Sequence, residues 1–276
     1  MTKKRSVATQ SNLDTKEKTY KKLINFYKIA IDPSFIDTRK TSSEVLKEYI
    51  FKAFKNQTFN LEDVIIEKIE LDDNYFFGSI CRRSDLDILT EVKSVYDEKS
   101  IKNADIIIES YTYFLIDLNN LSMSVIKTQK IPRSDEYIKD LILKISPLNV
   151  VIAPFLKKEE EIKSMLANSL TFYDNSDKYI GLKQSSLFDC EFGELTIKAK
   201  LKNKNKNIMR NLINTFKGNS DIKSLSASTD SEDIDLLKSS FTKHVTIELS
   251  KDYKNDLDRI RRTLAKELSV IETQSI

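Results

Sequence analysis

The chain has 276 residues, of which 40% are hydrophobic and 32% charged, and its 45 Lys and Arg against 42 Asp and Glu give a net charge of +3. This length suits one large domain or two domains of about 140 residues, and the hydrophobic content is enough for a sizeable core. One histidine, four glycines and two cysteines exclude a two-histidine metal site and a glycine-rich phosphate loop, and a serine-histidine-aspartate triad would have to use His244. Because the net charge is small, any surface that attracts polyanions must be local.

The sequence favours a cytoplasmic protein. No apolar stretch approaches the roughly 20 residues of a membrane-spanning helix, so we expect no membrane insertion. The first ten residues are basic, but no apolar stretch of the signal-peptide type follows them. In a reducing compartment, Cys81 and Cys190 are expected to be two free thiols.

In the first half of the chain, two helices are expected to precede a series of strands. Residues 1–13 are polar and aperiodic, which indicates a disordered basic segment at the N-terminal end of the sequence. Apolar residues then recur at helical spacing over residues 15–30, and Ser42 or Ser43 can cap a second helix. The β-branched and aromatic stretches that follow predict strands over residues 64–71, 74–82, 106–117 and 121–128, with hairpin turns at residues 72–73 and 119–120.

The second half mixes helices and strands. The pattern predicts helices between Ser134 and Pro147 and over residues 159–168, 207–216 and 252–269, with strands over residues 150–153, 170–173, 179–182, 195–201 and 242–249. Residues 217–235 are rich in Ser, Asp, Thr and Gly, which predicts a mobile surface loop. The order of elements indicates an α+β fold, with mixed or antiparallel sheets and flanking helices. It leaves room for two subdomains, an N-terminal region over residues 14–131 and a C-terminal region over residues 132–276.

A basic run provides the main functional signal. Seven cations and no acid lie between residues 198 and 217. Lys198, Lys200 and Lys202 alternate on a predicted strand and therefore point to one face, where they can neutralise successive phosphates. Lysines on an outer strand face are also a common way to solubilise a sheet edge, and that interpretation stays open. The expected nucleic-acid-binding residues are Lys198, Lys200, Lys202, Lys204, Lys206, Arg210, Arg259, Arg261 and Arg262.

A second hypothesis rests on residues 84–93. Asp87, Glu91 and Lys93 resemble the acidic half of a PD-(D/E)xK nuclease, in which carboxylates hold a divalent metal and a lysine orients water. An E-x-K tripeptide on a strand places both functional groups on one face. Under this alternative the protein is an enzyme that needs Mg²⁺ or Mn²⁺, and otherwise no metal or cofactor is expected. An exposed charged strand is the competing interpretation.

Three further segments carry a resemblance. They are Tyr75-Phe76-Phe77-Gly78-Ser79-Ile80, the stretch from Glu109 to Asp117, and Val150-Val151-Ile152-Ala153-Pro154. Followed by the strand over residues 195–201 and a strand-helix pair over residues 245–268, they resemble the RexA-like phage-exclusion and abortive-infection proteins in topology, over residues 70–268. The resemblance implies a cytoplasmic, oligomeric DNA-binding sensor or regulator that acts with a partner protein in antiviral defence. It assigns no functional residue, because that family offers no catalytic signature to match.

Three hypotheses therefore stand. The first is a defence protein that binds nucleic acid, expected to be DNA, with little sequence specificity, because neither a stacking-aromatic pattern nor a helix-turn-helix signature accompanies the lysines. The second is the metal-dependent nuclease. The third is a non-catalytic protein-interaction subunit of a defence complex, which an ordinary sheet edge at the lysine strand would favour.

Overall fold

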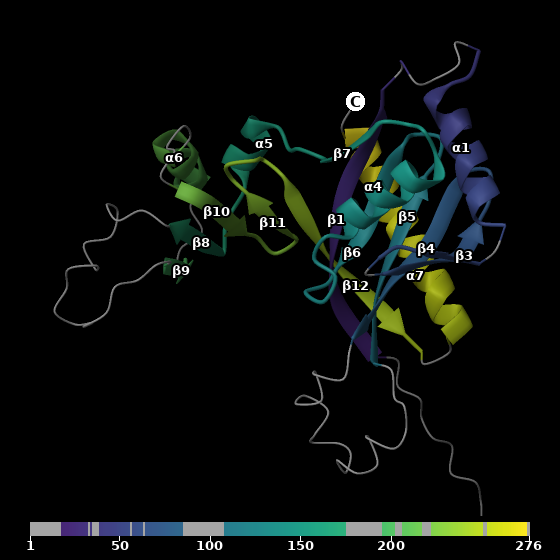
Figure 1. Ribbon diagram of the computed structural model, residues 1–276. Coiled ribbons are helices and arrows are strands. Elements are labelled where there is room, and N and C mark those ends of the chain that lie inside the picture. The colour runs from purple at the N-terminus through teal and green to yellow at the C-terminus, as the bar shows by residue number, and fades with distance from the viewer. Residues whose placement is uncertain are drawn as a thin grey trace, which may run out of the picture.

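The computed structural model describes residues 18–32, 34, 39–55, 57–62, 64–84, 108–174, 195–201, 206–216, 222–250 and 253–274. Its strands are β1 (Lys18–Ile31), β2 (Thr58–Asn60), β3 (Ile65–Leu71), β4 (Tyr75–Ser84), β5 (Ile108–Asp117), β6 (Ser122–Lys127), β7 (Val150–Pro154), β8 (Ser169–Asp174), β9 (Leu195–Lys200), β10 (Ile222–Ser228), β11 (Glu232–Asp235) and β12 (Phe241–Leu249). These strands form one antiparallel sheet in the order β2-β3-β4-β5-β6-β1-β12-β11-β10-β8-β9, and β7 pairs with the far end of β1 (Figure 1). Helices lie against both faces, which confirms the α+β class.

The strand β1 occupies the segment that the sequence predicted as the first helix, so that prediction is wrong. The spacing of Ile24, Tyr27 and Ile31 fits a helix, but a strand buried on both faces also carries apolar residues at irregular intervals. Ile24 and Phe26 belong to the core on one side of the sheet, and Ile29 and Ile31 belong to the core on the other. One edge of β1 pairs with β12 and then β7, while β6 pairs with the opposite edge.

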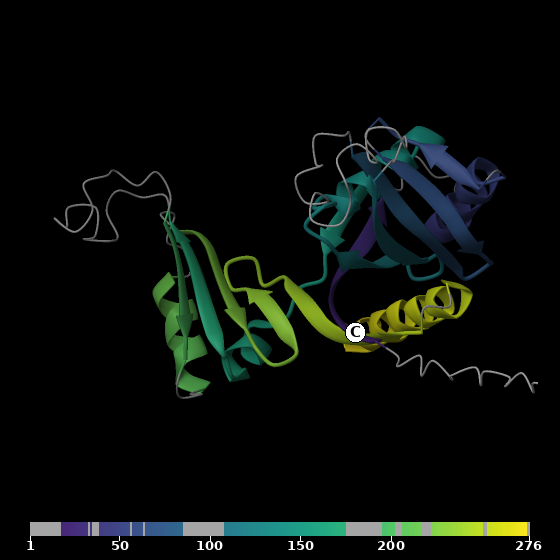
Figure 2. The same cartoon turned by 90° about the horizontal axis from the view of Figure 1, so that it is seen from below.

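A first lobe surrounds β1 and is covered on both faces. It contains β1 to β7 and β12, with α1 (Ser42–Ala53) and α4 (Ser134–Ile145) on one face and α7 (Tyr253–Gln274) across the other (Figures 1 and 2). Thr41 caps α1 in a reciprocal capping box with Glu44, one residue before the predicted start. The hairpins expected around residues 72–73 and 119–120 are confirmed as β3–β4 and β5–β6.

A second lobe extends the sheet away from β12 (Figure 2). It contains β8 to β11, α5 (Glu159–Ser164) and α6 (Lys206–Phe216). The mobile loop expected over residues 217–235 is wrong for its described part, because β10 and β11 form there. Leu225, Ala227 and Ile234 are buried at alternate positions, whereas the Ser and Asp residues between them point outward and give the stretch its loop-like composition.

The expected boundary between residues 131 and 132 lies inside the first lobe. Ile138 and Leu141 of α4, which follow that boundary, share a core with Val45 and Ile50 of α1. The chain then crosses into the second lobe after β7 and returns through β12, so the two lobes do not follow the order of the sequence. The strand predicted over residues 179–182 and the basic segment over residues 1–13 lie outside the described residues. None of the helices in the described ranges combines the length and apolar character needed to cross a membrane.

Candidate binding surface on the open face of the sheet

Two rows of polar residues run across the sheet from the second lobe to the first. The strand register fixes both rows, because each residue is the direct cross-strand partner of the next. The first row is Lys200, Ser169, Ser228, Asp233, Thr242 and Asn25, and the second is Lys198, Thr171, Ser226 and Asp235. We call the surface that these ten residues form the open face.

The opposite side of the same strands is apolar. The row between the two polar rows contains Leu170, Ala227, Ile234 and Phe241, all buried in one core cluster. Met209 and Ile213 of α6 and Ile162 of α5 belong to this cluster, so these helices cover the apolar side. Alternation along each strand therefore leaves a polar face without a covering helix in the described part of the second lobe.

The open face is hollowed where the two lobes meet. A cavity of about 560 Å³ lies over it, and Lys127 of β6, Asp135 of α4 and Lys238 add to its walls. This volume falls within the usual range of ligand sites, roughly 300 to 1,000 Å³. The described lining residues include three lysines, Lys127, Lys198 and Lys238, and three aspartates, Asp135, Asp233 and Asp235, together with hydroxyl and amide groups.

A hydrogen-bonded chain orders the floor at β1. The Thr242 hydroxyl donates to Asn25 Oδ1 at 2.7 Å, and Asn25 Nδ2 donates to the Tyr27 hydroxyl oxygen at 3.1 Å. Burial, together with the negative charge of Asp135, raises the pKa of Tyr27 to about 12. Tyr27 therefore stays protonated at neutral pH, and its O–H remains a hydrogen-bond donor rather than a charge.

Two of the three carboxylates among the described lining residues, Asp235 and Asp233, have partners within the fold. Asp235 Oδ1 accepts hydrogen bonds from the backbone N–H groups of Leu237 and Lys238, at 3.0 and 3.1 Å. Asp233 Oδ2 lies 3.2 Å from His244 Nε2. By contrast, the ammonium groups of the cavity and its edge form no ion pair within the described residues: Lys127, Lys198, Lys200 and Lys238.

The structure divides the predicted basic run between two surfaces. Lys198 and Lys200 are both exposed on β9 and point to the open face, as their alternation predicted. Arg210 is exposed on α6, the helix that covers the opposite side of the sheet. Lys206 begins that helix, and Lys202 and Lys204 lie outside the described residues. In the described part, the run therefore supplies two cations to the open face.

The arginines of α7 are engaged elsewhere. Arg261 lies between two carboxylates, with its Nε 3.0 Å from Glu70 Oε2 and its Nη2 3.1 Å from Asp72 Oδ2. Arg262 pairs with Asp258 at 2.8 Å, and Arg259 Nη1 donates to the backbone oxygen of Glu248 at 3.2 Å. Since α7 packs on the sheet side of Ile24 and Phe26, opposite Asn25, the three arginines and the two exposed lysines of β9 do not form one continuous surface.

The expected nuclease residues Asp87, Glu91 and Lys93 lie outside the described residues. Within the described ranges, no three His, Cys, Asp or Glu residues gather into a group that could hold a metal ion. Asp72, a further carboxylate near that motif, accepts hydrogen bonds from the N–H groups of Asn74 and Tyr75 and pairs with Arg261. The Asp72 carboxylate therefore stabilises the hairpin turn and binds Arg261 of α7.

Several residues of the surface were not predicted from the sequence. Asn25, Tyr27, Lys127 and Lys238 come from segments far from the basic run, and only the strand register brings them together. A local signal existed in the second lobe, where polar residues alternate with apolar ones at positions 169–171 and 224–228.

A comparison of the chain with protein-family models and with curated proteins gave no match.

Proposed function

We propose that the protein binds nucleic acid, DNA in the first instance, on the open face of the sheet and without chemistry of its own. The observation that carries the proposal is the pair of exposed lysines Lys198 and Lys200 at one end of the polar rows, with Lys127 and Lys238 toward the other lobe. Ammonium groups on both sides of a hollow suit a phosphate backbone that crosses it. The hydroxyl floor adds groups that bind phosphate and sugar oxygens.

The same surface supports binding with little sequence specificity. Phosphate and sugar contacts fix the position of a nucleic acid but do not read its bases. Among the described residues no arginine lines the cavity, and its aromatic residues are not free to stack: Phe26 and Phe241 are buried, and Tyr27 is partly buried and held by Asn25. Base edges and base stacking therefore contribute little to the expected affinity.

The proposal is tested by fluorescence polarisation with labelled single-stranded and duplex DNA at several salt concentrations. Binding should weaken as salt rises, and the Lys198→Glu, Lys200→Glu double variant should raise the Kd at least about tenfold and reduce the salt dependence, because two phosphate contacts are reversed in sign. The matched control is Lys52→Glu, Lys55→Glu, which makes the same charge change at exposed lysines of α1 and its C-terminal end. Equal loss in both variants, or no loss in either, would refute the open face as the binding site.

The setting in antiviral defence, with a partner protein and an oligomeric state, belongs to this proposal and rests on the resemblance to the phage-exclusion proteins. It predicts that cells expressing the protein with its neighbouring genes give fewer phage plaques. It also predicts that the double variant at Lys198 and Lys200 loses this effect. Plaque counts that are the same with the wild type and with an empty vector would contradict it.

A protein-interaction role is the second candidate, and one observation favours it. In the described residues β9 is the last strand of the sheet, so its outer edge has unpaired backbone groups. Lysines at such an edge oppose accidental pairing with other strands. If the function is instead to bind a partner protein that adds a strand to β9, a stable complex with that partner should form and the protein should not bind DNA. Co-purification detects the complex, and the DNA titration then distinguishes the two functions.

A further inference from the structure

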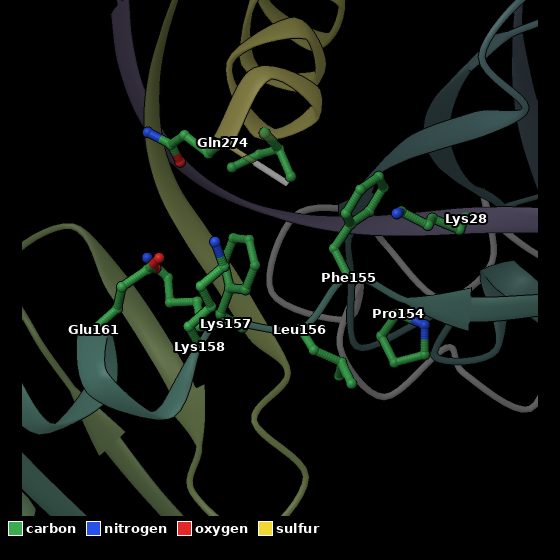
Figure 3. Close-up of a pocket in the computed structure, with 10 residues that line it drawn as sticks. Lys28, Pro154, Phe155, Leu156, Lys157, Lys158, Glu161 and Gln274 are labelled. Atoms are coloured by element: carbon green, nitrogen blue, oxygen red, sulfur yellow. The ribbon is translucent and has the colours of Figure 1, made fainter. Parts of the chain in front are cut away.

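A second cavity lies on the α7 side of the junction between the lobes (Figure 3). Its volume is about 310 Å³, at the lower end of the roughly 300 to 1,000 Å³ typical of small-molecule sites. Lys28 of β1 and Gln274 of α7 contribute to it from the first lobe, and Lys157, Lys158 and Glu161 from the second. A ligand in this cavity would therefore contact both lobes.

Two phenylalanine rings position the lysines of this cavity. Lys28 Nζ lies 5.1 Å from the centre of the Phe155 ring, and Lys157 Nζ lies 4.9 Å from the centre of the Phe241 ring. Both rings are at least nine-tenths buried, with 4% and 8% exposure, so they form a fixed wall. Cation–π contacts of this kind hold an ammonium group in place without neutralising its charge.

The charges of the cavity differ in whether they have a partner. Lys157 Nζ lies 2.8 Å from Glu232 Oε2, and both side chains are largely buried. Lys28 and Lys158, which are exposed, form no ion pair within the described residues. Glu161 is the one carboxylate among the described residues that line the cavity. The cavity therefore presents two unpaired ammonium groups, one from each lobe, next to one carboxylate.

An apolar wall completes the site. Leu156 is 60% exposed, the highest value among the exposed large hydrophobic residues of the described chain, and Pro154 next to it is also exposed. Figure 3 shows Leu156 and Pro154 on the side of the cavity that leads toward Lys28. A ligand that carries both negative charge and an apolar part would satisfy the lysines and cover Leu156 at once.

We propose that this cavity binds a small molecule of nucleotide size, with its phosphate groups at Lys28 and Lys158 and its organic part against Leu156 and Pro154. Phosphate groups fit better than a single carboxylate, because a chain of phosphate groups carries several negative charges at neutral pH and can offer a separate group to each of the two lysines. Lysine binds phosphate as a point charge and needs no fixed fork geometry. The site is distinct from the open face, and binding of its ligand can be measured without nucleic acid.

The two cavities share part of their walls. Pro154 and Phe241 line both of them, so each cavity lies against the same short connections between the lobes. A ligand that bridges the lobes in the second cavity fixes their relative orientation and with it the width of the open face. Coupling of this kind is reciprocal, so each ligand changes the affinity for the other by the same factor.

Isothermal titration calorimetry of the full chain with ATP and with tripolyphosphate tests the site without DNA. ATP should bind, and it should bind more tightly than tripolyphosphate, which has similar charge but no organic part. The Lys28→Ala, Lys158→Ala variant should raise the Kd for ATP at least about tenfold, corresponding to about 1.4 kcal/mol. No heat with ATP at millimolar concentration, or equal affinity for ATP and tripolyphosphate, would overturn the proposal.

Two further variants separate this site from folding and from the open face. Leu156→Glu places a carboxylate in the cavity at an exposed position and should abolish ATP binding while the melting temperature stays within a few degrees of the wild type. Lys52→Ala, Lys55→Ala is the charge-matched control and should bind ATP normally. Lys198→Glu, Lys200→Glu should also bind ATP normally even if it no longer binds DNA, so failure of one proposal is distinguishable from failure of the other. ATP binding that survives in both Leu156→Glu and the Lys28, Lys158 variant would place the ligand elsewhere.

Discussion

Arg261 of α7 donates a hydrogen bond from Nη2 to Oδ2 of Asp72, at 3.1 Å, and so fastens the last helix to the β3–β4 hairpin. Its Nε lies 3.0 Å from Glu70 Oε2, and the guanidinium group lies 5.9 Å from the centre of the Tyr75 ring. Three contacts therefore use the charge and the flat face of this side chain within the fold. The sequence predicts Arg261 to be a phosphate ligand. In the structure it links α7 to the β3–β4 hairpin through Asp72, which lies 189 residues earlier in the chain.

Replacing Arg261 with Gln should lower the free energy of unfolding by about 1 kcal/mol, because the side chain is partly exposed and its partners are more so. The DNA affinity should not change. The measurements are urea unfolding and the polarisation titration, with Arg262→Gln as the control, since Arg262 is 76% exposed and pairs with Asp258 on its own helix. If Arg261→Gln lowers the DNA affinity but leaves the stability unchanged, Arg261 is part of the nucleic-acid interface after all.

Gly78 in β4 should tolerate no side chain. A Cβ atom there would lie 2.5 Å from the backbone oxygen of Glu67 and 2.7 Å from Cζ of Phe114. The backbone of the neighbouring strand cannot move aside without breaking the β3–β4 pairing, so Gly78→Ala should destabilise the protein by about 2 kcal/mol. Urea unfolding measures this, and Thr19→Ala, at an exposed position of β1, is the control. A stability equal to that of the wild type would show that β3 can shift at this point.

Glu272 should make the stability depend on pH. Burial raises its pKa above the usual 4.5, and the nearby Asp117 raises it further, while hydrogen bonds from Ser122 and Asn120 act in the opposite direction. The folded protein therefore favours the protonated carboxyl. The stability this contributes is fully present below the unfolded pKa and is lost as the pH rises through the raised folded pKa.

The variant Glu272→Gln cannot ionise but still offers Ser122 an acceptor oxygen. Its free energy of unfolding should increase relative to that of the wild type as the pH rises from about 4 to about 7. Urea unfolding at a series of pH values gives the difference. Adding Ser122→Ala to the wild type removes a hydrogen bond that lowers the pKa, so the loss of stability should then occur at higher pH. A difference between wild type and Glu272→Gln that is constant with pH contradicts both expectations.

The nuclease hypothesis has a direct test. We expect no cleavage when the protein is incubated with linear or circular DNA in the presence of Mg²⁺ or Mn²⁺, because the proposed function is binding alone. The readout is gel electrophoresis over several hours, with a Glu91→Ala variant in parallel. Cleavage by the wild type that disappears in this variant would replace the proposed function with metal-dependent hydrolysis.

The elements that the sequence predicted well are those whose local pattern determines their structure. The hairpins around Asp72 and Asn119 have polar turn residues between apolar strands, and α1 follows a capping box at Thr41. β1 was missed because it is covered on both faces and shows no simple alternation. β10 and β11 were missed because one of their faces is open and consists of Ser and Asp, the residues that are most common in loops.

The candidate surface was predictable only in part, for a related reason. Alternation on one strand is enough to place Lys198 and Lys200 on one side of β9. It gives no indication that Asn25 and Lys127 lie across the same hollow, because those residues reach it through the pairing of β1 with β12 and with β6. Pairing between strands so distant in the chain depends on the whole sheet and leaves no local trace in the sequence.

That pairing also bears on how the protein reaches its folded state. The hydrogen bond between Asn25 and Thr242 spans 217 residues, so one edge of β1 lacks its β12 partner until synthesis of the chain has reached β12. Contacts of such long range slow folding, and an apolar strand with an open edge is prone to aggregation in the meantime. We therefore expect the time between synthesis of β1 and arrival of β12 to be the step at which the nascent protein most needs a chaperone.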